Sequence, residues 1–196
     1  MRSLLAVGIA AVLCAGALSW AADERVADRV VIVKSTRTLT LLNHGQVLKT
    51  YQVALGGDPV GPKVKAGDKK TPEGDYVIDR KNAHSRFHLA LHISYPNPAD
   101  SERARQLGVS PGGGVEIHGL EAKYAWVGSL HRQVNWTAGC IAVTNPEIEE
   151  IYKLVPVGTP VEIGADEKPV EHTETVDPKT GNLHLTVPIV ASKPKQ

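Results

Sequence analysis

Apolar and polar residues alternate in short runs along much of this chain, and this period of two constrains the fold more than any other feature. The first such segment, residues 29 to 55, reads RVVIVKSTRTLTLLNHGQVLKTYQVAL. Its alternating apolar positions are Val30, Ile32, Leu39, Leu41, Val47, Tyr51 and Val53, and Asn43-His44-Gly45 supplies a turn. Alternation of this kind is typical of strands that bury one face, so the segment predicts a β-hairpin.

Further strands are predicted at YVIDRK, FHLALHISY, VEIHGL and GTPVEIG. Two short helices are predicted between them. NPADSERARQLG begins at Asn97 as N-cap, and TNPEIEEIYKLV carries Asn145 as its expected cap, with Pro146 at the first helical position. These elements predict a mostly β fold, with a sandwich or barrel-like core and a few short helices.

Two segments fall outside this strand pattern. Residues 56–76 are rich in Gly, Pro, Asp and Lys and form a long connection, which in a compact domain is often functional. Residues 165–196 contain alternation and turn chemistry that predict an accessory β-hairpin followed by a frayed tail.

The N-terminal segment is predicted to be a secretory signal, cleaved after residue 21. Arg2 is the positive n-region, Leu4 to Leu18 are almost continuously apolar, and Ser19-Trp20-Ala21 offers a cleavage site. A membrane anchor is disfavoured because the run is shorter than the roughly 20 residues that a span needs. A lipoprotein site at Cys14 is disfavoured by the large residues before it. We expect the mature chain to have no transmembrane segment and to reside in the periplasm or cell-wall space.

Cleavage would change both the charge and the thiol content of the chain. The whole sequence has 22 Lys and Arg against 21 Asp and Glu, and losing Arg2 makes it formally neutral. This balance argues against nucleic acid or an anionic membrane as the main partner. Cys140 would then be the only thiol in an oxidising compartment, either as a small buried hydrophobe or as a functional group.

The surroundings of Cys140 suit a nucleophile. Ala138 and Gly139 leave room for a substrate, and the backbone N–H groups of Gly139 and Cys140 are candidate oxyanion donors. Among the histidines, His118 stands out as a candidate base because it ends an apolar strand and precedes Gly119. His84, His88 and His92 are spaced by four residues, but they fall in a strand region without carboxylate or cysteine partners. We therefore expect no metal site.

Several motifs together resemble the L,D-transpeptidase (YkuD-type) catalytic domain. IHGL supplies His118 and Gly119, and WTAGCIAVTNPE supplies Thr137, Gly139, Cys140, Ile141, Val143, Asn145 and Glu147. The upstream TPEGDY resembles a further family segment at Thr71, Pro72, Gly74 and Tyr76. The resemblance covers roughly residues 29 to 164, which we take as the catalytic domain.

The resemblance implies a β-rich, exported enzyme that acts on peptidoglycan stem peptides without a metal or organic cofactor. Cys140 would attack the carbonyl of an L-configured diaminoacyl residue joined to a D-amino acid. His118 would accept the thiol proton and later protonate the leaving amine. The acyl group would pass to another stem peptide, to a wall-attached lipoprotein lysine, to a free D-amino acid or to water.

One position departs from the family pattern. Ala142 stands where the family usually has an Arg, two residues after the cysteine. Arg132 is a candidate substitute for recognising a carboxylate. His92 and Tyr95 are candidate pocket residues, although strand packing explains them equally well. Trp126 and Trp136 could cover either the site or the core.

Three function classes follow from these residues. The first is a cysteine acyl-transferase on stem peptides, and the second is a carboxypeptidase or amidase that uses the same cysteine with water. The third is a non-catalytic wall-binding module. A papain-like protease fits less well because its cysteine precedes its histidine in the chain.

Overall fold

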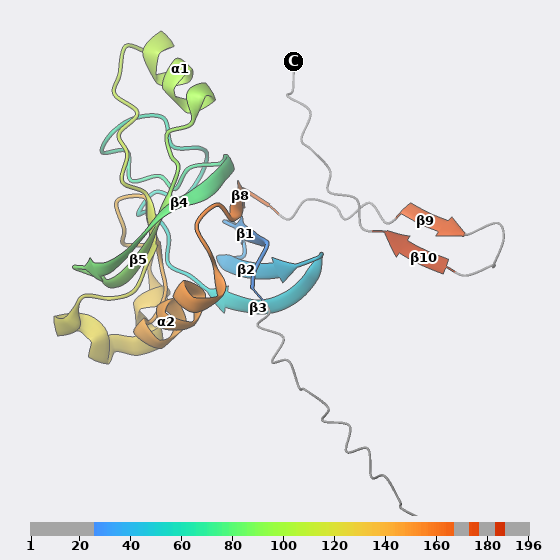
Figure 1. The fold of residues 1–196 in the computed structure, drawn as a ribbon. Coiled ribbons are helices and arrows are strands. Elements are labelled where there is room, and N and C mark those ends of the chain that lie inside the picture. The colour runs from blue at the N-terminus through green and yellow to red at the C-terminus, as the bar shows by residue number, and fades with distance from the viewer. Residues whose placement is uncertain (1–25, 167–172, 177–182, 187–196) are drawn as a thin grey trace, which may run out of the picture.

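The protein, a computed structural model, is described for residues 26–166, 173–176 and 183–186. Its main body is one mixed sheet in the order β3-β2-β1-β8-β4-β5-β6-β7 (Figure 1). The strands are β1 (Arg29–Val33), β2 (Thr38–Asn43), β3 (Gln46–Gln52), β4 (Gly74–Ser85), β5 (His88–Ile93), β6 (Glu116–His118), β7 (Ile141–Ala142) and β8 (Pro160–Gly164). The helices are α1 (Pro98–Gln106), α2 (Asn145–Leu154) and the 3-10 segment η1 (Ala122–Gln133). The expected mostly β fold with a few short helices is confirmed.

The sheet curls so that its two ends meet. β1 pairs in parallel with β8 and β6 pairs in parallel with β7, whereas the other neighbours are antiparallel. Ala54, just after β3, forms an antiparallel bridge with Ala142 of β7 through N–H···O contacts of 3.0 and 2.8 Å. The continuation of one edge strand therefore pairs with the opposite edge, which is how a half-barrel begins to close.

The first alternating segment contains three strands instead of a single hairpin. The turn at His44 and Gly45 occurs as expected, with positive φ angles of 47° and 76°. A second turn separates β1 from β2, and its last residue, Arg37, has a φ of 54°. The sequence signal for this turn, Lys34-Ser35-Thr36-Arg37, contains no glycine or proline, which is why alternation alone merged the two strands.

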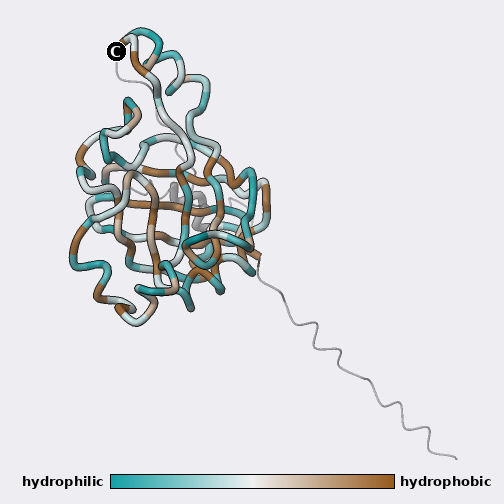
Figure 2. Tube along the Cα trace, turned by 90° about the vertical axis from the view of Figure 1, so that its left-hand side faces the viewer, coloured by the Kyte–Doolittle hydropathy of each residue, from teal (hydrophilic) through white to brown (hydrophobic). Residues whose placement is uncertain are grey.

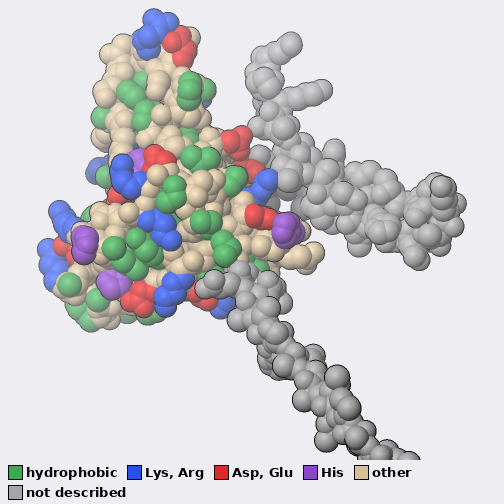
Figure 3. Space-filling view, in the orientation of Figure 1, with side chains coloured by type: hydrophobic (Ala, Val, Ile, Leu, Met, Phe, Trp, Pro, Cys, Tyr) green, Lys and Arg blue, Asp and Glu red, His purple; other side chains and the backbone are tan. Residues whose placement is uncertain are grey.

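The core is formed by one buried set of strand side chains together with the buried face of α2. Large side chains without solvent exposure include Ile32, Leu39, Ile78, Leu91, Ile117 and Ile141 from the strands and Ile148 and Ile151 from α2. Along the crossing strands in Figure 2, hydrophobic and hydrophilic residues alternate, as the period of two requires. On the face in Figure 3, basic and acidic side chains are interspersed, in keeping with the balanced charge.

Both predicted helices form, but the cap of the second differs from the expectation. Asn97 caps α1, and its side chain accepts from the Asp100 N–H at 2.9 Å. The N-cap of α2 is Thr144, and Asn145 is the first helical residue. The Glu147 carboxylate accepts from the Thr144 N–H at 2.9 Å and from its hydroxyl at 2.7 Å. The side chain of Asn145 is thereby free for another contact, described below.

The long connection of residues 56–73 is tied to the sheet by a buried cation. Lys34 donates to Gly61 O at 2.7 Å, to Thr71 O at 3.0 Å and to Glu73 Oε1 at 2.7 Å. Burial lowers the pKa of the Lys34 ammonium, while Glu73 opposes that shift. Thr71 in turn accepts from the Gly56 N–H at 3.0 Å.

The C-terminal segment contains β9 (Thr173–Val176) and β10 (Leu183–Thr186), which pair antiparallel as a separate two-stranded sheet. The turn between them, the expected frayed tail and the expected signal segment 1–21 lie outside the described residues. None of the helices in the described ranges is long and apolar enough to cross a membrane.

Candidate active site

Cys140 and His118 are brought together by the parallel pairing of β6 with β7. His118, the last residue of β6, lies opposite Ala142, and Ile117 lies opposite Ile141. The Val143 N–H donates to His118 O at 2.9 Å and extends the pairing. Cys140 immediately precedes β7, two positions before the partner of His118. Residues far apart in sequence thus become neighbours on adjacent strands.

A tight turn at Thr137 and Gly139 presents Cys140. The Thr137 hydroxyl donates to Cys140 O at 2.7 Å and accepts from the Gly139 N–H at 3.1 Å. Gly139 has a φ of 136°, and a Cβ there would lie 2.6 Å from Lys70 O. Only glycine avoids this clash and accepts this backbone conformation. Because its N–H is already engaged by Thr137, Gly139 is not a free oxyanion donor, whereas the Cys140 N–H has no acceptor among the described residues.

The ring of His118 is buried and held in one tautomer. Its residue exposure is 2%, and Nδ1 lies 2.7 Å from the carbonyl oxygen of Gly119. Because a carbonyl can only accept, Nδ1 carries the hydrogen and Nε2 is left with its lone pair. Phe87 stacks on the ring at 4.3 Å between centroids, and Trp136 packs edge-on at 5.9 Å. Burial lowers the pKa of His118, so the imidazole is neutral at neutral pH.

The start of α2 positions the segment after His118. The Asn145 side chain accepts from the Leu120 N–H at 2.6 Å. A Cβ at Gly119 would lie 2.6 Å from that same Asn145 oxygen and 2.9 Å from the Ile148 side chain. Gly119 is therefore required by the close approach of α2, and Asn145 fixes the carbonyl that orients the His118 ring.

The Cys140 side chain is partly buried and protonated in this arrangement. Its Sγ donates to Gly114 O at 3.6 Å. Burial raises the pKa of the thiol most, and the charge of Glu116 also raises it, whereas a hydrogen bond with the Glu116 backbone and the charge of Lys63 lower it. A protonated thiol beside a neutral imidazole is the resting state that these surroundings favour.

Neither Ala142 nor Arg132 offers a free cation at the site. Ala142 has no solvent exposure and bonds through its backbone to Ala54. Arg132 contacts the Glu147 carboxylate through Nη2, and its carbonyl accepts from Arg37 at 2.8 Å. The Arg132 charge is thus paired with Glu147, the carboxylate of the α2 capping box.

His92 and Tyr95 make their hydrogen bonds away from Cys140 and His118. His92 Nδ1 lies 2.6 Å from Asp79 Oδ1 on the neighbouring strand. Tyr95 is 3% exposed and donates to Pro111 O at 3.0 Å, and burial raises its pKa to about 12. Tyr95 therefore contacts, through Pro111, the loop that also contains Gly114, whose carbonyl accepts from the Cys140 thiol.

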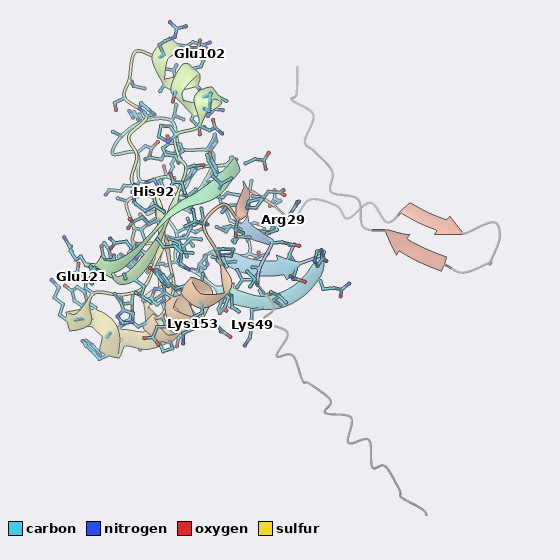
Figure 4. The ribbon with its side chains drawn as sticks, viewed as in Figure 1. Arg29, Lys49, His92, Glu102, Glu121 and Lys153 are labelled. Carbon is cyan, nitrogen blue, oxygen red and sulfur yellow. The ribbon has the colours of Figure 1, made fainter. Side chains whose placement is uncertain are left out.

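An apolar cavity of about 400 Å³ adjoins the His118 ring through Phe87 and Trp136, which line it. The rest of its lining comes from Leu120, Glu121, η1 and Val134. In Figure 4, Glu121 lies beside η1, whereas His92 lies on the sheet in a different part of the molecule. The cavity, Phe87 and the role of Asn145 escaped the sequence reasoning. Phe87 lies just before a strand and Asn145 lies inside a helix-start motif, and no sequence pattern at either position predicts these contacts.

Comparisons with known proteins show the family to which this chain is similar. Residues 27–163 match the family model described as the L,D-transpeptidase catalytic domain, YkuD. The Escherichia coli protein named L,D-transpeptidase YafK is 31% identical over 132 residues, or 64% of this chain and 46% of that protein. The Bacillus subtilis protein named L,D-transpeptidase YqjB is 27% identical over 146 residues, or 72% of this chain and 74% of that protein.

Solved structures give the same fold. The helical cell shape determining protein Pgp2 from Campylobacter jejuni aligns with a TM-score of 0.55 and 26% identity, covering 74% of this chain and 53% of that one. Bdellovibrio bacteriovorus Bd1075 aligns with a TM-score of 0.50 and 21% identity, covering 72% and 51%. The chain spans about half the length of YafK, Pgp2 and Bd1075.

Proposed function

Because the chain belongs to the family of L,D-transpeptidase catalytic domains, we propose that it is an exported cysteine acyl-transferase that acts on peptidoglycan stem peptides. The observation that carries the proposal is the His118 ring, whose Nδ1 is bound to Gly119 O and whose strand, β6, pairs in parallel with β7 directly after Cys140. A base in a fixed tautomer beside a thiol is what acyl transfer by cysteine requires.

In the first half of the reaction, His118 Nε2 accepts the thiol proton as Sγ attacks the carbonyl carbon of the stem peptide. Since burial raises the thiol pKa and lowers the His118 pKa, proton transfer accompanies the attack and no resting ion pair precedes it. The Cys140 N–H is the proposed donor to the oxyanion. His118 then returns the proton to the departing amine of the D-amino acid, which leaves a thioester on Cys140.

In the second half, an acceptor attacks the thioester carbonyl while His118 removes its proton; the C–S bond then breaks, and His118 returns the proton to the Cys140 sulfur. An amine acceptor gives a cross-link or an attachment to a protein lysine, and water gives a shortened stem. Water is the second candidate acceptor. It is favoured because neither the buried Ala142 nor Arg132, which is paired with Glu147, supplies a free cation to bind a negatively charged group of an acceptor.

The two outcomes are distinguished by incubating residues 22–196 with purified muropeptides and analysing the products by mass spectrometry. Cross-linked products indicate transfer, and shortened stems alone indicate hydrolysis. We expect His118→Ala to lower the rate by about 100- to 10,000-fold, the usual contribution of a general base. Product formation by Cys140→Ser at the wild-type rate would contradict the proposal.

A non-catalytic wall-binding module is tested without substrate. Such a module would leave the rate of Cys140 alkylation unchanged in His118→Ala, whereas the enzyme should lose thiol reactivity with its base. Export is tested separately: the protein recovered from the producing cell's periplasmic or wall fraction should have the mass of residues 22–196.

A further inference from the structure

Lys63 is a buried cation that lies against the residue preceding Cys140. Its side chain is 4% exposed. Its Nζ lies 3.8 Å from the point where a Cβ on Gly139 would stand. Lys63 belongs to the long connection between β3 and β4, far from Cys140 in sequence, so only folding places its charge here.

The ammonium of Lys63 is held in place by Asp68. It donates to Asp68 Oδ1 at 2.7 Å and to Lys65 O at 3.2 Å. The Asp68 carboxylate also accepts the backbone N–H groups of Val64 at 2.8 Å, Lys65 at 3.0 Å and Lys70 at 3.1 Å. Although burial opposes it, these hydrogen bonds hold the pKa of Asp68 well below its usual value. Two of the three ammonium hydrogens are engaged, and the third has no acceptor among the described residues.

The charged and titratable groups around Cys140 come from two elements. Strand β6 contributes Glu116 and His118, and the connection contributes Lys63 with Asp68. A hydrogen bond with the Glu116 backbone favours a thiolate at Cys140, the charge of Glu116 disfavours it, and the charge of Lys63 favours it. Ala142, at the position where the family usually has an arginine, is buried and carries no charge, and the charge of Arg132 is paired with Glu147. Lys63 is thus the cation in the described part of the chain that acts on Cys140.

We propose that Lys63 is a positioning residue whose ammonium, fixed by Asp68 against Gly139, stabilises the negative charge that develops on the Cys140 sulfur. A buried charge near a developing charge acts strongly because little water screens it. The inference rests on the proposed role of Cys140 as nucleophile. The competing interpretation is an ion pair that only closes the loop of residues 63–70.

The test is the pH dependence of Cys140 alkylation by iodoacetamide in residues 22–196, which contain no other cysteine. We expect Lys63→Met to raise the pH of half-maximal rate by about one unit, because a neighbouring opposite charge shifts a pKa by about that much. Lys63→Arg should stay near the wild type. Lys65→Met, which removes the same charge from an exposed side chain of the same loop, should leave the midpoint unchanged.

A folded Lys63→Met protein with the wild-type midpoint would overturn the inference. If that variant does not fold, Asp68→Asn is used instead, because it keeps the Lys63 cation and removes the anion that neutralises it. The pH of half-maximal alkylation should then fall. An unchanged or raised pH of half-maximal alkylation counts against the inference. With muropeptides, Lys63→Met should lower kcat about tenfold at neutral pH and leave KM within about twofold. Alkylation needs no muropeptide, so it reports on Lys63 even if the proposed substrate is wrong.

Discussion

Single hydrogen bonds decide which atoms near Cys140 can react. The Gly119 carbonyl holds the His118 hydrogen on Nδ1, and the Thr137 hydroxyl engages the Gly139 N–H. The first contact leaves a basic nitrogen at Nε2, and the second removes one of two expected oxyanion donors. At the scale of single residues, the groups that can take part in the reaction are those not already engaged in hydrogen bonds within the protein.

The acid limb of the pH profile should reflect the buried His118. In the proposed mechanism the ring must be neutral to accept the thiol proton. Burial lowers its pKa from 6.5, so activity should persist below pH 6.5 and fall only as pH passes the lowered value. Measuring kcat/KM against pH on muropeptides checks this. A limb centred at or above 6.5 would mean that the ring is not desolvated as the structure has it.

Gly139→Ala should destabilise the protein by roughly 1–3 kcal/mol, the usual cost of a strained backbone, with the clash against Lys70 O added. Urea unfolding monitored by circular dichroism measures the loss. Gly45→Ala is the matched control, since its φ of 76° is also positive but nothing lies within 4 Å of the added Cβ. Equal losses in the two variants would exclude the contribution of the Lys70 contact.

At the scale of elements, the first two residues at the start of α2, Thr144 and Asn145, have different roles. Thr144 and Glu147 satisfy the helix terminus, and Asn145 turns outward to hold the Leu120 N–H. The strand β6 ends beside this contact. The helix start is therefore part of the support of the site as well as a piece of secondary structure.

Asn145→Ala should cost about 1–3 kcal/mol of stability, because it leaves the partly buried Leu120 N–H without its acceptor. It should also lower kcat, since the Gly119 carbonyl that orients His118 loses its support. Asn145→Asp keeps the acceptor oxygen and should retain most of both properties. Chemical unfolding and muropeptide turnover measured on the same samples compare the two variants, and equal behaviour of both would contradict the role given to the oxygen.

At the scale of the whole molecule, the curl of the sheet assembles the site from distant parts of the chain. β7 lies between β6 and the residues that follow β3. The connection of residues 56–73 packs against the Cys140 turn, with Gly139 close to Lys70 O. Lys34, directly after β1, binds two carbonyl oxygens of that connection, those of Gly61 and Thr71.

Lys34→Met should destabilise the protein by about 3–5 kcal/mol, because it leaves the partly buried Glu73 charge and two carbonyl groups without their partner. Lys49→Met is the control, since the Lys49–Glu150 pair is exposed and should contribute less than about 1 kcal/mol. Differential scanning calorimetry of both variants measures the contrast. Similar losses would show that Lys34 does not hold the connection.

The sequence by itself determined most of the strands, the helices α1 and α2, the candidate pair Cys140 and His118 and the family resemblance, because periodicity, turn residues and motif order are local properties of the chain; it predicted neither β7 nor η1. It missed the turn between β1 and β2, which lacks glycine and proline, and it placed the α2 cap one residue late. Tertiary structure alone decided that Arg132 pairs with Glu147 and that Lys63 lies beside Gly139. Each of these depends on contacts between segments distant in sequence, and no local pattern encodes the position that a folded sheet gives to a single charge.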